Sequence, residues 1–158
     1  MKRLFTFILS LLCITIAYSS HIYEGNSTYS NKIIYTYCNG YLYYGNSTYS
    51  SDIAYMIDGK TIYEGKNAYN NTFMLTFDGK YFYDNKHMFS SDIVYTYRNH
   101  RVYKGKSEYS SDIVLTIDND SRKVYKGRNK YSSNVIMRYQ GSIPTHVIVF
   151  VALNLLNK

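Results

Sequence analysis

Tryptophan is absent from this 158-residue chain, and proline occurs once, at Pro144. Cysteine occurs twice, so no disulfide framework can hold the fold together and packing alone must stabilise it. No apolar run reaches the roughly 20 residues that a membrane-spanning helix needs. Histidine occurs at positions 21, 87, 100 and 146, and none of the four has another histidine or a cysteine at the spacing typical of zinc ligands. We therefore expect neither a cofactor, nor a metal, nor an enzymatic activity.

The first segment has the layout of a secretory signal peptide. Two basic residues precede an apolar stretch over 4–17, and small residues follow, which predicts a leader over 1–19. A transmembrane anchor would need a longer run, and a lipoprotein site at Cys13 would need a small residue in place of Leu12. We expect an exported chain, secreted or held at the cell envelope, whose net charge falls from +7 to +5 with the two basic residues. Cys38 is then the one remaining cysteine, free or bridged between molecules.

Tyrosine is abundant, with 21 copies, and it marks a repeat of about 20 residues. The first column of the repeat is Tyr23, Tyr43, Tyr63, Tyr83, Tyr103 and, after two extra residues, Tyr125. An apolar residue precedes each one, and two positions after the tyrosine comes a glycine in five copies and Asn85 in the fourth copy. Glycine and asparagine best tolerate positive φ, so this position is predicted to be left-handed. Six copies at this period predict a repeat domain over 20–142.

A second aromatic column lies four residues beyond the glycine, and comprises Tyr29, Tyr49, Tyr69, Phe89, Tyr109 and Tyr131. Because Phe89 lacks a hydroxyl, the ring is expected to matter more than the hydroxyl, and the column to anchor the core beneath a polar loop. Asp52, Asp92, Asp112 and Asn134 then precede β-branched runs, where their side chains can shape a turn. A ring of cation ligands is the alternative, but Lys32 and Thr72 occupy two equivalent positions. The Asp118-Asn119-Asp120 stretch lacks the glycine and glutamate of a calcium loop and is assigned to a hairpin turn.

Each unit is predicted to be a strand, a tight turn, a second strand and a loop of about eight residues. Residues rich in Ile, Val, Tyr and Thr, such as 92–97, form the first strand. Asn39-Gly40, Asp58-Gly59 and Asp78-Gly79 are strong hairpin signals. If the first two are two-residue turns, Tyr37 faces Leu42 and Tyr55 faces Ile62; a longer shared loop is the alternative.

Apolar side chains on both faces of such a hairpin require stacked or circularised units. We expect an all-β fold of six hairpin repeats, and favour a closed, flower-like or propeller-like ring over an open β-solenoid, because closure removes exposed strand edges. A β-trefoil would show a repeat about twice as long. Residues 143–158 break the pattern: Pro144 precedes the apolar run 147–156, for which we favour a helix over a strand. This segment is expected to be a short cap on the last hairpin.

Basic residues gather in the last two repeats, and the patch comprises Arg101, Lys104, Lys106, Lys123, Lys126, Arg128 and Lys130. Basic and aromatic residues together can indicate nucleic-acid binding, but a secretory leader argues against that partner. An anionic envelope surface or an acidic polysaccharide is the more consistent target, and a solvated charged face is the alternative. Tyrosines outside the two columns can stack on sugars or contact proteins, and the candidates for ligand binding are Tyr41, Tyr44 and Tyr81.

The unit, apolar-Tyr-x-Gly followed by Tyr-Ser-Ser-Asp-Ile and a turn, resembles short hairpin repeats of uncharacterised secreted bacterial proteins. It also resembles, in size and layout, choline-binding and cell-wall-binding repeats, which build their ligand sites with the tryptophan that this chain lacks. The resemblance implies a binding or surface-interaction module, with a glycan or envelope polymer as its partner. A structural or self-assembling surface protein is the alternative.

Overall fold

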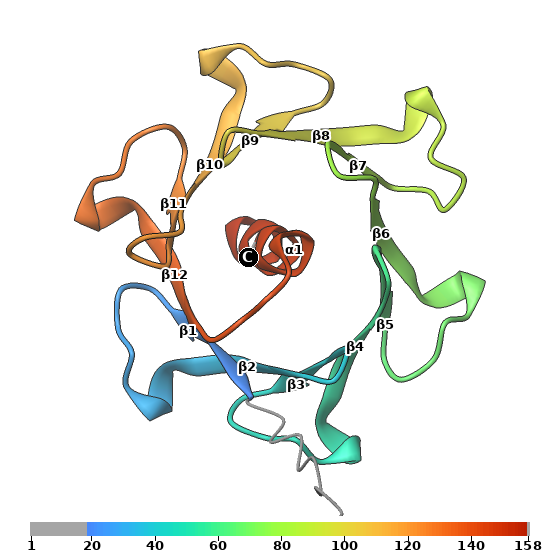
Figure 1. Cartoon of the computed structure of the whole chain (residues 1–158), viewed down its shortest axis with the longest axis vertical. Helices are drawn as coiled ribbons and strands as arrows, with labels where there is room; N and C mark the ends of the chain where they lie inside the picture. The colour runs from blue at the N-terminus through green and yellow to red at the C-terminus, as the bar shows by residue number, and fades with distance from the viewer. Residues whose placement is uncertain (1–18, 158) are drawn as a thin grey trace, which may run out of the picture.

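The computed structural model of the protein describes residues 19–157 and shows twelve strands closed into a cylinder around a central helix (Figure 1). The strands are β1 (Ser20–Glu24), β2 (Ile33–Cys38), β3 (Tyr41–Tyr44), β4 (Ile53–Asp58), β5 (Thr61–Glu64), β6 (Phe73–Phe77), β7 (Tyr81–Tyr83), β8 (Ile93–Arg98), β9 (Arg101–Lys104), β10 (Ile113–Asp118), β11 (Lys123–Lys126) and β12 (Val135–Gln140). The helix is α1 (Thr145–Leu156). The predicted all-β ring of six hairpins is confirmed, whereas the predicted leader lies outside the described residues except for Ser19.

Every strand pairs with its neighbours in antiparallel fashion, and β1 pairs with β12 to close the ring. Six loops project outward from the cylinder, and we call them petals 1 to 6 (Figure 1). They comprise residues 25–32, 45–52, 65–72, 84–92, 105–112 and 127–134, and each ends in a one-turn 3-10 helix. These 3-10 helices are η1 (Ser30–Lys32), η2 (Ser50–Asp52), η3 (Asn70–Thr72), η4 (Ser90–Asp92), η5 (Ser110–Asp112) and η6 (Ser132–Asn134). No helix of the described part is long and apolar enough to cross a membrane.

The tight turns lie at the end of the cylinder opposite the petal bases, and the first two share one register. Tyr37 pairs with Leu42 as predicted, but Ile62 pairs with Ile57 instead of Tyr55. The second turn is therefore made by the two residues after Asp58, which itself pairs with Thr61. Gly59 stands at the first of these positions with a φ of 58°, the conformation that a hairpin turn needs there. The predicted offset between the first two hairpins was wrong.

The left-handed position after the first tyrosine column holds for the glycines but not for the asparagine. The five glycines have φ between 61° and 75°, and their amides bond to a neighbouring strand, as from Gly45 to the Ile34 carbonyl at 2.9 Å. Asn85 is not among the described residues with positive φ; in petal 4, Met88 takes that conformation instead. There the Asp84 amide donates to the Asp92 carbonyl at 3.0 Å. Petal 4 therefore has its own backbone path.

Helix α1 lies inside the ring and forms the centre of the hydrophobic core (Figure 1). Around it stands a ring of fully buried side chains from the same position of each repeat, namely Ile22, Leu42, Ile62, Phe82, Val102 and Val124. Side chains alone can fill the interior of a ring of about eight strands, and twelve strands enclose a wider space that needs further filling. The helix supplies it, with Val147, Val149 and Val151 completely buried and Phe150 packed edge-on against Tyr55 at 4.9 Å. The predicted helix is confirmed, but its predicted place as a cap on the last hairpin was wrong.

The first tyrosine column forms a second buried layer on the outer face of the ring, beneath the petals. Its six rings are between 4 and 8% exposed, as expected for core residues. Several pair across strands with a buried threonine, such as Tyr43 with Thr36 and Tyr103 with Thr96. The Thr36 hydroxyl donates to the Gly45 carbonyl at 2.7 Å, which fixes the base of petal 2 on the sheet. The outer layer therefore connects each petal to the cylinder.

His146 is a buried polar group at the start of α1. Its ring stacks on Phe77 at 6.1 Å, and its Nε2 has no hydrogen-bond partner. Burial lowers the pKa of His146, and the nearby Lys60 ammonium acts in the same direction against a hydrogen bond with the Gly59 backbone. The neutral imidazole is therefore the form that the core accepts.

Because the unfolded chain binds this proton more readily, the protein should lose stability in acid. The contribution of neutral His146 is complete above the unfolded-state pKa of about 6.5 and is lost as the pH falls through the pKa of the folded protein. Thermal melting from pH 7.5 to 4.5 should show a steeper decline for the native protein than for His146→Phe, which keeps the ring packed against Phe77. Both proteins share the remaining histidines, so parallel curves would contradict this assignment.

Gly141 joins β12 to the segment that enters the ring, and it has a φ of 83°. A Cβ atom there would lie 2.2 Å from the Ser20 Oγ atom and 3.0 Å from the Ser20 Cα atom. Gly141→Ala should therefore destabilise the fold more than Gly127→Ala, at a position of φ 70° with open space around it. Overpacking predicts an excess of about 1–3 kcal/mol in the free energy of unfolding, measured by denaturant titration. Equal losses would show that the close approach to Ser20 is absent in solution.

Candidate functional site

Each petal carries one aromatic residue immediately before its 3-10 helix, held by the backbone on both sides. In petal 2 the Tyr49 amide donates to the Ser47 hydroxyl at 3.1 Å, and the Tyr49 carbonyl accepts from the Asp52 amide at 2.9 Å. The second of these bonds recurs in all six petals, at 2.9–3.1 Å. The aromatic residue is extended, with φ −77° and ψ 142° at Tyr49. The backbone of this position is fixed while its side chain is left free.

These side chains form the second aromatic column, and they are exposed. The exposed fractions are 78% for Tyr29, 76% for Tyr49, 62% for Tyr69, 60% for Phe89, 77% for Tyr109 and 66% for Tyr131. The prediction that this column anchors the core was wrong, because α1 and the first tyrosine column already fill the space on either side of the sheet. A signal was present in the sequence: the column lies among serine, threonine and asparagine, without the apolar alternation of a buried strand. We call these six residues the aromatic rim.

The acidic column stabilises the petals from within. Asp52 accepts hydrogen bonds from Ser47 and Ser51, and Asp112 accepts the equivalent bonds from Ser107 and Ser111. The Ser47 and Ser51 hydroxyls lower the pKa of Asp52, against a weaker effect of burial. The petals project away from one another (Figure 1), so the acidic residues are not gathered, and the described chain holds no group of three His, Cys, Asp or Glu side chains fit for a metal. The turn-forming role predicted for this column is confirmed.

The three tyrosines predicted to bind a ligand lie apart. Tyr41 and Tyr81 start β3 and β7 on the outer face, half-buried, and Lys80 Nζ lies 4.7 Å from the centre of the Tyr81 ring. Tyr44 stands at the other end of β3, opposite Tyr35, with ring centres 5.7 Å apart. Tyr44 is 58% exposed. The structure therefore places two of these tyrosines at the turns and one at the petal end, and joins none of them to the aromatic rim.

The basic patch covers one sector of the molecule without forming a single surface. Four members lie on strands that flank β10, namely Arg101 and Lys104 on β9 and Lys123 and Lys126 on β11. Lys106, Arg128 and Lys130 belong to petals 5 and 6. Lys106 donates to the Ser90 hydroxyl at 2.7 Å, and Lys130 pairs with Asp118 at 3.2 Å. Arg101 and Lys130 line one pocket together.

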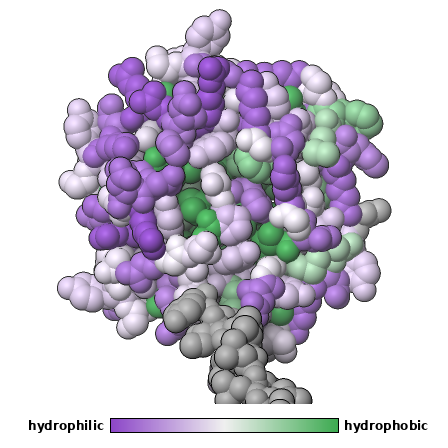
Figure 2. All heavy atoms as spheres, viewed as in Figure 1, coloured by the Kyte–Doolittle hydropathy of each residue, from purple (hydrophilic) through white to green (hydrophobic). Residues whose placement is uncertain are grey.

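One apolar patch departs from the polar character of the surface. Figure 2 shows a largely hydrophilic face, with hydrophobic residues toward its middle and over the petal between β7 and β8. That petal holds Met88 and Phe89, which are 46% and 60% exposed. The same petal has the distinct backbone path described above, so the six copies of the aromatic rim are not identical.

Comparison with known proteins identifies the repeat. The profile of the 6-fold beta flower protein family matches residues 22–152, and the chain belongs to that family. The match runs from β1 into α1 and therefore covers all six hairpins and the first part of the central helix. No curated protein and no solved structure matches the chain. The resemblance to cell-wall-binding repeats stays a prediction.

Truncation should strongly reduce stability in the first aromatic column and hardly at all in the second, and repeat 5 offers a matched pair of residues. Tyr103 is 7% exposed, so Tyr103→Ala should lower the free energy of unfolding by about 3–5 kcal/mol, the loss typical of truncating a buried aromatic side chain. Tyr109 is 77% exposed, so Tyr109→Ala should change the free energy of unfolding by no more than about 0.5 kcal/mol. Chemical denaturation measures both, and comparable losses would show that the Tyr109 ring packs against the protein in solution.

Proposed function

We propose that this 6-fold beta flower protein is an exported binding module that holds a repetitive polymer, a glycan of the cell envelope in the first place, through its aromatic rim. The observation that carries the proposal is the exposure of one large ring on every petal, at 60–78%. Aromatic rings pack against the apolar faces of sugars, and the tyrosine hydroxyl can bond to sugar hydroxyls. A polymer offers the same contact repeatedly, as the ring of petals does.

Stability gives no reason for these rings to be aromatic. Fully burying an aromatic side chain stabilises a fold by about 1.5–3 kcal/mol, and rings this exposed forgo most of that gain. The core is complete without them, because α1 and the inward-facing side chains of the strands fill the interior of the ring. Tyrosine, which occupies this exposed position in five of the six petals, is enriched where proteins contact a partner, because its ring is apolar and its hydroxyl is polar.

The petals also prepare the rings for binding. The backbone on each side of Tyr29, Tyr49 and Tyr109 is fixed by a serine hydroxyl and by the 3-10 turn. A contact residue held in place loses less conformational entropy when a ligand arrives. Six weak contacts on one rigid body then reinforce one another, since the later contacts form within a complex that already exists.

A structural or self-assembling role is the other candidate, and the fold favours it less. Assembly through strand edges needs an unpaired strand, but β1 and β12 pair along His21–Glu24 and close the described sheet. Assembly through a disulfide would need Cys38, which is half-buried at the end of β2. Binding is therefore the function that the exposed rings support best.

The test is binding of the purified protein to a panel of soluble polysaccharides, with a variant that lacks three rim tyrosines. Tyr29, Tyr49 and Tyr109 are changed to alanine, and the control changes the adjacent exposed Ser30, Ser50 and Ser110 to alanine. At about 0.5–1.5 kcal/mol for each aromatic contact, the triple tyrosine variant should bind at least about tenfold more weakly, and the control should bind as the native protein does. Native binding should persist in high salt.

Three results would contradict the proposal. The first is unchanged binding by the triple tyrosine variant. The second is binding that disappears in high salt, which would assign it to the basic residues. The third is the absence of binding to any polysaccharide together with self-association in sedimentation, which would favour the structural role.

A further inference from the structure

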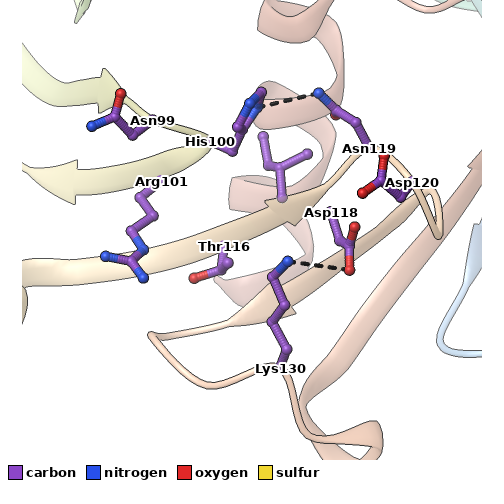
Figure 3. Close-up of a pocket in the computed structure, with 9 residues that line it drawn as sticks. Asn99, His100, Arg101, Thr116, Asp118, Asn119, Asp120 and Lys130 are labelled. Carbon is purple, nitrogen blue, oxygen red and sulfur yellow. Dashed lines mark hydrogen bonds and ion pairs between the residues drawn. The ribbon is translucent and has the colours of Figure 1, made fainter.

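A polar pocket of about 380 Å³ lies on the outer face of the ring beside the turns of the last two hairpins (Figure 3). The turn between β8 and β9 contributes Asn99 and His100, and the turn between β10 and β11 contributes Asn119 and Asp120. Lys130 reaches in from petal 6. The volume is in the range of small-molecule sites, which begins near about 300 Å³.

The pocket arises where the repeat is broken. The turns at 39–40, 59–60 and 99–100 have two residues, whereas the turn between Asp118 and Lys123 has four. The two extra residues are those that interrupt the 20-residue spacing before Tyr125. They allow Asn119 to extend over the preceding hairpin turn and to contact His100 (Figure 3).

A chain of hydrogen bonds holds one wall of the pocket. The Tyr139 hydroxyl donates to Asn119 Oδ1 at 3.0 Å, which directs the Asn119 amide group toward His100 Nδ1 at 3.2 Å. The Tyr97 hydroxyl lies 3.3 Å from the same nitrogen. Since Nδ1 accepts, the proton of the neutral imidazole is on Nε2, which is left as a donor.

The remaining polar groups divide into cations and carboxylates. Arg101 is exposed, and its guanidinium has no ion-pair partner among the described residues. Its planar fork of donors fits a carboxylate group. Asp118 bonds to Lys130 at 3.2 Å and to the Ser121 amide at 3.4 Å. Burial alone would raise the pKa of Asp118, but the Lys130 ammonium and the Ser121 groups outweigh it and lower the pKa, so that the carboxylate is available as an acceptor.

We infer that this pocket binds an acidic sugar residue, with the sugar carboxylate on Arg101 and the sugar hydroxyls between Asp118, Asp120 and Lys130. A sugar acid combines one carboxylate with several hydroxyls that both donate and accept, and the lining offers a matching set. No tyrosine or phenylalanine lines the pocket, so it recognises its ligand by hydrogen bonds and charge, unlike the aromatic rim. The inference rests on the proposed function, since it names the residue of the glycan that the protein would select.

The test is calorimetric titration of the purified protein with glucuronate, with glucose and with inorganic phosphate. Glucuronate should bind, and glucose should bind at least about tenfold more weakly, because it lacks the group that pairs with Arg101. Arg101→Gln should reduce glucuronate binding by a similar factor and leave the melting temperature unchanged, since the side chain is exposed. Lys66→Gln is the matched control, an exposed basic residue of petal 3 outside the pocket lining and outside the basic patch, and should bind as the native protein does.

Several results would overturn the inference: no binding of glucuronate, equal binding of glucose, unchanged affinity in Arg101→Gln, or phosphate binding as strong as that of glucuronate. The last would make the pocket a general anion site. The rim variant separates this inference from the proposed function. Glucuronate binding without polysaccharide binding would refute the rim alone, and polysaccharide binding that depends on Tyr29, Tyr49 and Tyr109 without glucuronate binding would refute the pocket alone.

Discussion

The packing of α1 against the inner face of the ring is the interaction on which the rest of the structure depends. Each short strand contributes little buried surface, and a ring of twelve has an interior wider than the side chains can fill. A helix of twelve residues rises about 18 Å, close to the length of a six-residue strand, so it fills the axis from end to end. Its residues 147–153 are apolar on every side, as expected for a helix surrounded by protein. Removal of the helix would leave six inner side chains, from Ile22 to Val124, facing an empty axis.

Ring closure and helix insertion support each other. Gly141 carries the chain from β12 past Ser20, and the same Ser20 hydroxyl bonds to the Ser142 carbonyl at 3.3 Å, so the first strand and the segment before the helix meet at one point. The Tyr23 hydroxyl adds a bond to Gln140 Oε1 at 2.7 Å across the closing pair of strands. The last segment of the chain can enter the axis only where the first strand completes the sheet. Formation of the core therefore requires contacts between residues more than 100 positions apart, which makes folding of this simple repeat cooperative over the whole chain.

Repetition made most of this fold predictable, and the exceptions have physical causes. Period, composition and the Asn-Gly turn fixed the hairpins, and the need to bury both faces favoured a closed ring. The register of the second hairpin was missed because Asp58-Gly59 is a good turn pair by itself, whereas the pairing of Ile57 with Ile62 is decided by the neighbouring strands. The place of α1 was missed because a short apolar segment packs equally well over an end or along an axis, and only the ring diameter decides. The aromatic rim was missed because hydrophobic rings are ordinarily core residues, and its polar neighbours were the contrary signal.

The separation of the molecule into a helix-filled core, a tyrosine layer and a set of petals explains how one scaffold can carry different surfaces. The Thr36 hydroxyl and its equivalents Thr96 and Thr116 attach the petal bases to the sheet through the Gly45, Gly105 and Gly127 carbonyls. Among the described residues, no side-chain hydrogen bond joins a buried core residue to a side chain of the rim. A petal can therefore change its exposed ring without disturbing the axis, as petal 4 does with Met88 and Phe89. Changes in the turns are similarly tolerated, because the two residues added before Lys123 displace no inner side chain: Val124 remains fully buried. Six-fold repetition places one exposed ring on every petal, and the one broken repeat adds a polar pocket beside its longer turn.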